Sequence, residues 1–459
     1  MRLLKSSWQA FLLLSLLLLM LGANAIAQEK ANPSERSTTS TVKALPAKSR
    51  PPVAQNADAE HQSVSGSPGE REDDADQILR RAEWFYRQRS SANGHIPAGA
   101  RLKAFQHMQR MRVAEGKLAL RPDGTYAAVT PQVGPPVGGA WSSLGPTPTS
   151  GGFFSPVSGR VEAIAVDPSD PTGNTVLVGG AQGGIWRSTD GGSTWTPTGD
   201  SNPSLAMGSI AFAPSTCNPS PGTCPVYAGT GEQASVGFDV YYGAGVLVST
   251  DHGQTWKQTC TVASTTCPFI GPFNNTVNFG FFNDGGARIS YIAVNPSNPN
   301  LVLVGAQIAS GGGLAGETLG GIYCSSDGGA TWTPLLSGEA GSFVGFASST
   351  VAYAALGRPD GSAAGAANPN GIYKSTNADA ASCSGITFAP VAQQPTLQTM
   401  GRIDLAIAPS DTSGNTVYAS IANGSDGSRI NLGVFVTTNG GTSWTQTTAP
   451  DICRFQCWY

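Results

Sequence analysis

The sequence predicts an all-β protein, a β-propeller of four-stranded antiparallel blades preceded by a short helical segment. An octet that combines an Asp or Asn, glycines and a tryptophan recurs along the chain. Each copy follows short apolar segments of strand length, and such self-similarity is typical of repeat architectures. Gly and Pro are abundant, at 58 and 32 of 459 residues. This composition indicates many short strands joined by tight turns.

The octet explains the turn at which each unit closes. Its Asp or Asn can accept backbone N–H bonds at the start of a tight turn, and the following Gly permits a positive φ. We expect the Trp to open the next strand and to pack its ring into the blade core. A degenerate copy begins at Ser375–Asn377 and lacks the Gly and the Trp. The predicted structural residues of the four clear copies are Asp190, Trp195, Asp251, Trp256, Asp327, Trp332, Asn439 and Trp444.

Upstream of each octet lie three further predicted strands, which makes four per unit. In the first unit they are residues 160–168, 176–178 and 184–186, and the fourth strand opens at the Trp. Four antiparallel strands per repeat make one propeller blade. Five blades are predicted over residues 141–459, and Cys453–Tyr459 is interpreted as the opening strand of a sixth. We therefore interpret the propeller as incomplete, from a truncated reading frame or from a piece of a larger protein.

The first 27 residues predict a secretory signal peptide. Arg2 and Lys5 precede an apolar run from Ala10 to Gly22, and Ala25–Ala27 offers a small-residue cleavage site. An uncleaved membrane anchor is the alternative, although the run is short for a spanning helix. No later segment is apolar enough to span a membrane. The predicted location is therefore secreted, that is extracellular, periplasmic or at the cell surface.

Three segments separate the signal peptide from the propeller. Residues 28–75 are rich in Ser, Ala, Pro, Gln and Glu and predict a disordered linker. Residues 76–117 predict a basic amphipathic helical hairpin, and residues 118–140 a Pro/Gly-rich connector. In the second half of the hairpin the predicted apolar face consists of Leu102, Phe105, Met108 and Met111. A solvated amphipathic face that covers one side of the propeller is favoured over a membrane-surface or partner helix.

Charge and histidine content exclude several classes of function. The formal net charge is −3, so no global basic field favours nucleic acid. Only one of the four His residues, His252, lies among the repeats, which disfavours a His-based metal centre or a Ser-His-Asp triad there. We expect neither a cofactor nor a metal.

Eight cysteines indicate an oxidising compartment. Three local pairs and one longer one are the candidate disulfides. In two of the local pairs, six residues separate the two cysteines, and such a pair could instead bind a metal. The sequence places no other thiol or His to complete such a site. The candidates are Cys217 with Cys224, Cys260 with Cys267, Cys453 with Cys457, and Cys324 with Cys383.

The octets and the strands before them resemble those of the Asp-box (BNR) repeat proteins of the sialidase-like superfamily. Over residues 141–459 the match looks closest to secreted bacterial sortilin/Vps10-like and xyloglucanase-like (WD40/YVTN/BNR-like) propellers. Xyloglucanase-type propellers carry a catalytic Asp just before the Gly-Gly of blade one. Aligned on Gly183–Gly184 and Trp186, that position is Ala181, next to Gln182. The resemblance therefore implies that this catalytic base is missing.

Candidate ligand-binding residues are predicted on the face opposite to the octets. Arg160, Arg288 and Arg402 share one position at the start of the first strand of blades one, three and five. They could converge on an anionic group, as the arginine cluster of sialidase-like enzymes does for a sugar carboxylate. Local pairing, for example with Glu162 or Asp404, is the favoured alternative.

The long second-to-third-strand loop of blade two adds further candidates. Tyr241 and Tyr242 could stack against sugars. Glu232 and Asp239 could form the acid and base of a glycosidase, although a loop-ordering role is commoner for such carboxylates.

Three functions follow from these residues. The favoured one is a secreted, non-catalytic binding module for extracellular glycan, peptide or surface partners. The second is a glycoside hydrolase of sialidase-like or xyloglucanase-like descent. The third is a sortilin-like peptide-binding module of a larger secreted protein, with further blades or domains outside this chain. No nucleic-acid partner is expected.

Overall fold

The computed structural model describes residues 87–88, 100–122, 124–129, 159–232, 243–261, 266–269, 287–307, 320–338, 340–357, 368–395, 400–411, 413–424 and 431–447. The predicted signal peptide, the linker of residues 28–75 and the predicted sixth-blade strand Cys453–Tyr459 lie outside these ranges. Within them, no helix is long and apolar enough to cross a membrane.

The described part begins with one helix and one hairpin. Helix α3 spans Ala100–Ala114, inside the predicted helical segment. Strands β1 (Leu118–Leu120) and β2 (Tyr126–Ala128) then pair antiparallel, where the sequence predicted only a connector. The predicted apolar face of the helix is wrong in part, because Met108 and Met111 are 40% and 48% exposed. Gln109 is buried instead, since its amide donates to the Ser201 carbonyl at 3.0 Å.

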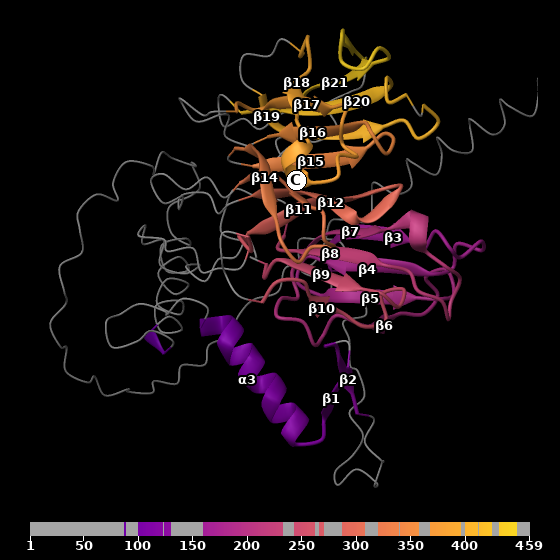
Figure 1. The fold of residues 1–459 in the computed structure, drawn as a ribbon, viewed down its shortest axis with the longest axis vertical. Helices are drawn as coiled ribbons and strands as arrows, with labels where there is room; N and C mark the ends of the chain where they lie inside the picture. The colour runs from indigo at the N-terminus through magenta and orange to yellow at the C-terminus, as the bar shows by residue number, and fades with distance from the viewer. Residues whose placement is uncertain are drawn as a thin grey trace, which may run out of the picture. The chain divides into compact units, whose positions relative to one another are not determined.

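Five four-stranded antiparallel sheets follow, one for each predicted blade (Figure 1). Within each sheet the strands pair in chain order, as expected for propeller blades. Blade one consists of β3 (Val161–Val166), β4 (Val176–Gly180), β5 (Gly184–Ser188) and β6 (Thr196–Pro197). Blade two consists of β7 (Met207–Phe212), β8 (Val226–Thr230), β9 (Val246–Ser249) and β10 (Lys257–Gln258).

The other three blades repeat this order. Blade three consists of β11 (Arg288–Asn295), β12 (Asn298–Gln307), β13 (Gly321–Ser325) and β14 (Thr333–Ser337). Blade four consists of β15 (Gly341–Phe346), β16 (Ala352–Leu356), β17 (Gly371–Ser375) and β18 (Ala389–Pro390). Blade five consists of β19 (Met400–Ile407), β20 (Val417–Asn423), β21 (Asn431–Thr437) and β22 (Thr445–Gln446).

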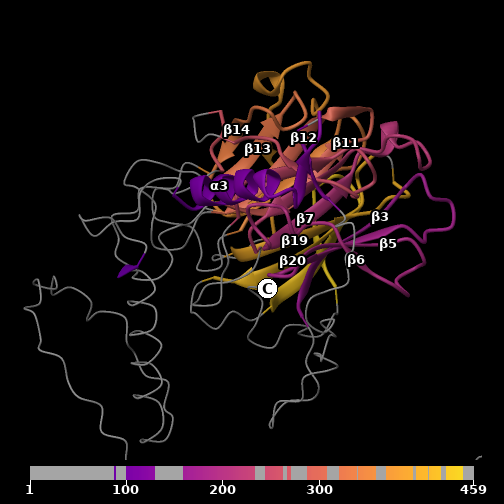
Figure 2. The ribbon, with the colours of Figure 1, turned by 90° about the horizontal axis from the view of Figure 1, so that it is seen from below.

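The hydrophobic core lies between consecutive blades. The first strands β3, β7, β11, β15 and β19 each contact the next, and Figure 2 shows β3 and β7 side by side. Between blades one and two, Leu177 and Ile185 meet Met207 and Val226, and all four are fully buried. Similar clusters of buried apolar side chains fill the other three boundaries. Each blade is therefore stabilised mainly by its neighbours, as in other repeat folds.

The octets form the predicted turns. In blade one, the Asp190 carboxylate accepts the Thr194 N–H at 2.8 Å and the Thr194 hydroxyl at 2.6 Å. Gly191 has a φ of +69°, a backbone conformation that residues other than Gly rarely adopt. Asp251 and Asp327 make the same two bonds, to Thr255 and Thr331.

The octet tryptophans pack against the preceding blade. Trp332 is 2% exposed and meets Phe269 edge-on, with ring centroids 5.3 Å apart. Trp256 is 6% exposed and its indole N–H reaches the Thr198 hydroxyl of blade one at 3.2 Å. Trp195 contradicts the prediction of a core position, because it is 39% exposed. The reason is positional: the described residues place no blade before blade one.

Three disulfides join Cys217 to Cys224, Cys260 to Cys267, and Cys324 to Cys383. These are pairs that the spacing predicted. The fourth predicted pair, Cys453 and Cys457, lies outside the described residues.

Candidate functional site

A β-bulge occurs near the beginning of the first strand in every blade. In blade one the register with β4 shifts between Val161 and Ala163, and in blade five that with β20 shifts between Met400 and Ile403. Blades two, three and four show shifts at the corresponding places. Bulges of this kind re-aim side chains. The three predicted arginines all stand at or beside these irregular positions.

Arg160 is held by two carboxylates. Its Nε lies 2.7 Å from Glu162 Oε1, and its terminal nitrogen meets Glu232 Oε1 from blade two. The Glu232 side chain is fully buried. The residue before it, Gly231, has a φ of +94°. A Cβ at this position would clash with backbone atoms of Arg288 and Gly243. The structure thus favours local pairing for Arg160. Its buried partner is Glu232, which the sequence had suggested as a candidate acid or base of a glycosidase.

Arg402 and Arg288 are buried at their own strand starts, with 6% and 4% of their surface exposed. Burial lowers the pKa of the Arg402 guanidinium, and the nearby carboxylates of Asp404 and Glu162 oppose that shift. Glu162 of blade one therefore acts on the arginines of blades one and five. Among the described residues, Arg160 and Arg402 thus each have acidic side chains close by.

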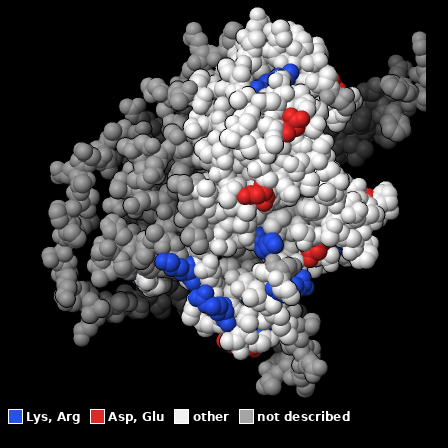
Figure 3. Space-filling view, in the orientation of Figure 1, with Lys and Arg blue, Asp and Glu red and all other residues white. Residues whose placement is uncertain are grey.

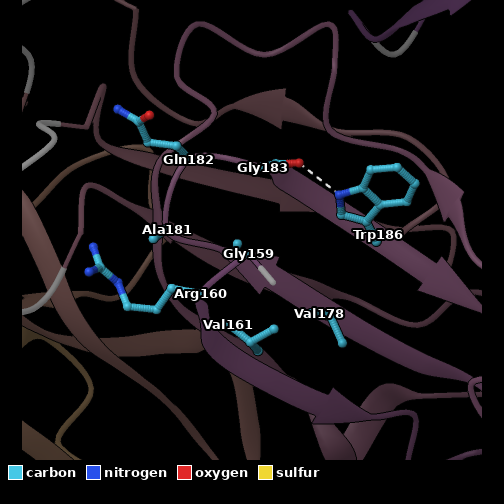
Figure 4. A pocket seen from close by; sticks show the side chains of 9 residues that line it. Gly159, Arg160, Val161, Val178, Ala181, Gln182, Gly183 and Trp186 are labelled. Carbon is cyan, nitrogen blue, oxygen red and sulfur yellow. Dashed lines mark hydrogen bonds between the residues drawn. The ribbon is translucent and has the colours of Figure 1, made fainter. Parts of the chain in front are cut away.

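A pocket of about 480 Å³ opens beside Arg160 on blade one. Figure 4 shows Arg160 and Gln182 on one side and the Trp186 ring on the opposite side, with Val161 and Val178 between them. Trp186 is 38% exposed, and its indole N–H is fixed by the Gly183 carbonyl at 2.7 Å. The backbone around Gly159, Gly180 and Gly183 completes the lining, together with Ala181. None of the described lining residues is acidic.

The predicted blade-two loop is only partly described. Asp239, Tyr241 and Tyr242 lie outside the described residues, so their predicted roles are not tested. Glu232 is described, and its ion pair with Arg160 fits the loop-ordering role better than that of a free acid or base.

A second polar cluster lies between blades one and two. Asp167, Cys224 and His252 are buried, and their potential ligand atoms lie within 4.8 Å of one another. The sequence placed no His near Cys224, and the structure corrects this expectation. His252 and Asp167 are 85 residues apart in the chain. The pattern of the octet therefore could not indicate that these two residues meet.

Charged side chains are sparse on the surface. Figure 3 shows one face on which Lys, Arg, Asp and Glu stand in small separate groups. Among the described residues on this face the charged side chains are few, in keeping with the charged content of 12%.

The four-stranded antiparallel sheets and their octet turns define the class: an all-β protein with a propeller-like fold and a BNR/Asp-box repeat. A family model described as BNR/Asp-box repeat matches residues 247–258, the octet turn of blade two with its flanking strands. Comparison with curated proteins gives no match.

Solved structures with a similar fold include two GH74 enzymes and a YCF48 protein. An ancestral GH74 enzyme has 20% identity over 63% of this chain and 31% of its own, with a TM-score of 0.42. GH74 from Niastella koreensis has 19% identity over 62% of this chain and 38% of its own, with a TM-score of 0.40. YCF48 bound to D1 peptide has 14% identity over 64% and 68%, with a TM-score of 0.34. The chain thus spans less than half of either GH74 enzyme.

Proposed function

We propose that the protein is a secreted, non-catalytic binding module that holds a neutral extracellular glycan in the pocket of blade one. The observation that carries this proposal is the Trp186 ring, fixed by its bond to the Gly183 carbonyl and exposed at the wall of the pocket. A rigid aromatic face opposite an amide, that of Gln182, suits a sugar ring with its hydroxyls. The three disulfides support an oxidising compartment.

The lining of the pocket argues against hydrolysis at this place. A glycosidase needs two carboxyl groups across the scissile bond. Ala181 stands where the xyloglucanase-like resemblance implies the base, and no acidic residue lines the described pocket. Glu232 lies nearby but is buried, and its carboxylate is paired with Arg160.

The ion pairs of Arg160 favour a neutral ligand over an acidic sugar. A guanidinium that recognises a carboxylate must present open donors to it. Arg160 already faces the carboxylates of Glu162 and Glu232. An anionic ligand would therefore meet two negative charges close behind the single positive one.

The test is a binding screen with neutral and acidic oligosaccharides, followed by calorimetry on the best ligand. We expect neutral glycans to bind and Trp186→Ala to weaken the affinity at least about tenfold, or ~1.4 kcal/mol. Gln182→Ala should weaken it less. Trp195→Ala is the matched control, because Trp195 is similarly exposed but does not line the pocket.

Other outcomes would replace the proposal. Tight binding of peptides without glycans would support the sortilin-like hypothesis instead. Hydrolysis of any glycan, lost in Glu232→Gln, would support the hydrolase hypothesis. If Trp186→Ala lowers the free energy of unfolding as strongly as loss of a buried Trp, this face serves the fold and not a ligand.

A further inference from the structure

The boundary between blades one and two contains a buried set of metal-ligand types. Asp167 directly follows β3, Cys224 comes just before β8, and His252 lies in the octet of blade two. Their exposed fractions are 2%, 0% and 1%. A carboxylate, an imidazole and a disulfide sulfur are thus buried together, and polar groups of this kind are costly to remove from water alone.

His252 occupies a backbone position that favours glycine. Its φ is +61°, and it is the one non-glycine residue with a positive φ among the described residues. The same position in the other clear octets is Gly191, Gly328 or Gly440, with φ values from +68° to +71°. A Cβ is disfavoured there by its contact with the following carbonyl. The imidazole must therefore contribute something that offsets this strain.

The hydrogen bonds around the cluster orient its ligand atoms. His252 Nε2 lies 3.0 Å from the Gly222 carbonyl, an acceptor, so this nitrogen carries the proton. Nδ1 pairs with Asp167 Oδ2 at 2.5 Å, so these two atoms share a second proton. Asp167 Oδ1 in turn accepts the N–H and the hydroxyl of Ser169, at 2.9 and 2.6 Å. A backbone carbonyl behind the imidazole and donors behind the carboxylate are the outer partners typical of metal ligands.

A second cysteine sulfur stands at the same place. Cys217 is bonded to Cys224 in the structure, and Cys224 Sγ lies 3.8 Å from Asp167 Oδ1. The loop between the two cysteines also supplies the Gly222 carbonyl. Two thiolates, one imidazole and one carboxylate would make a four-ligand set of the sort that binds Zn²⁺ tetrahedrally.

We propose that this boundary is a redox-gated zinc site, with Cys217, Cys224, His252 Nδ1 and Asp167 as ligands. In the oxidised form the disulfide occupies both sulfurs and excludes the metal. Two equivalents of a thiol reductant convert it to two cysteine thiols and release the reductant as its own disulfide. Zn²⁺ then binds both sulfurs, His252 Nδ1 and Asp167 as three protons leave, one from each thiol and one shared by Nδ1 and Oδ2. Asp167 and His252 move apart to admit the ion.

The experiment measures zinc and thiol protection on the full chain. Oxidised and thiol-reduced protein are incubated anaerobically with Zn²⁺, desalted and analysed for bound metal, and Co²⁺ replaces Zn²⁺ to show thiolate coordination by its charge-transfer absorption. We expect about one Zn²⁺ per reduced chain and none per oxidised chain. Bound zinc should also shield Cys217 and Cys224 from alkylation.

Two variants make the result specific. His252→Gly restores the residue of the other octets, should fold, and should lose at least about 100-fold in zinc affinity. Cys260→Ser with Cys267→Ser removes a disulfide of identical spacing that belongs to no group of potential metal ligands among the described residues, and should leave zinc binding unchanged. Equal zinc affinity in His252→Gly and the parent would overturn the proposal. So would a reduced parent that takes up no zinc, whether or not circular dichroism shows that it stays folded.

Discussion

The fully buried carboxylate of Glu232 meets the guanidinium of Arg160 across the boundary between blades one and two. The pair links the loop after β8 to the start of β3, two segments that share no strand pairing. Glu162 lies on the other side of the guanidinium, at 2.7 Å. Charge as well as apolar packing therefore holds the start of the first strand of blade one against the loop that follows the second strand of blade two.

Removal of the cation should be costly. Arg160→Met leaves the Glu232 carboxylate buried without its counter-ion, and we expect a loss of about 3 kcal/mol in the free energy of unfolding. Chemical denaturation of parent and variant measures this difference. The double variant Arg160→Met, Glu232→Leu should recover most of the loss, because it removes the buried charge as well.

An exposed pair gives the matched control for this prediction. Lys117 and Glu115 are 2.8 Å apart, with 66% and 48% of their side chains exposed. Lys117→Met should change the free energy of unfolding by less than about 0.5 kcal/mol. If the Arg160 and Lys117 variants lose equal stability, burial does not explain the contribution of the Arg160–Glu232 pair to the free energy of unfolding.

The low pKa of the Asp190 carboxylate leads us to expect a loss of stability in acid. Hydrogen bonds from the Thr194 side chain and backbone and from Ser188 lower the pKa of Asp190 to about 2, from 3.8. A depressed folded-state pKa stabilises the fold above about pH 4, and this contribution is lost as the pH falls through about 2. Asp190→Asn should therefore flatten the decline of the thermal midpoint between pH 4 and pH 2.

Blade five offers the reverse experiment. Its octet has Asn439, whose Oδ1 already accepts the Ser443 N–H at 2.9 Å and whose amide does not titrate in this range. Asn439→Asp lets the Ser443 hydroxyl donate to a carboxylate, as Thr194 does to Asp190. This variant should steepen the decline of the midpoint in acid. An unchanged pH profile in both variants would mean that the octet carboxylates do not govern acid unfolding.

The fold could be predicted because its signals are local. An octet contains its own turn, from the Asp that accepts the N–H four residues later to the Gly with positive φ. The three described disulfides were predictable for a similar reason, since two of them close loops of a few residues. Trp195 departs from its expected burial because its partner surface must come from a preceding blade, which the octet itself does not encode.

The site could not be predicted to the same extent, because its contacts cross blades. Arg160 was singled out by its repeated position, yet its partner Glu232 reaches it from a loop of another blade. His252 was noted only as the one His among the repeats, and only the fold brings it to Asp167. The exposed ring of Trp186 depends on which face of blade one is covered. Spacing within a repeat contains no information on these distances.

The octet tryptophans should contribute differently to the free energy of unfolding, according to whether a blade packs against them from the preceding side. Trp332 is 2% exposed against Phe269 of the preceding unit, whereas Trp195 is 39% exposed. Trp332→Ala should lower the free energy of unfolding by about 3–5 kcal/mol, because it leaves a large cavity between blades two and three. Trp195→Ala should cost less than about 1 kcal/mol, since much of its ring already contacts water. Denaturant titration of the two variants checks this order, and equal losses would show that Trp195 is buried in solution by a surface beyond the described residues.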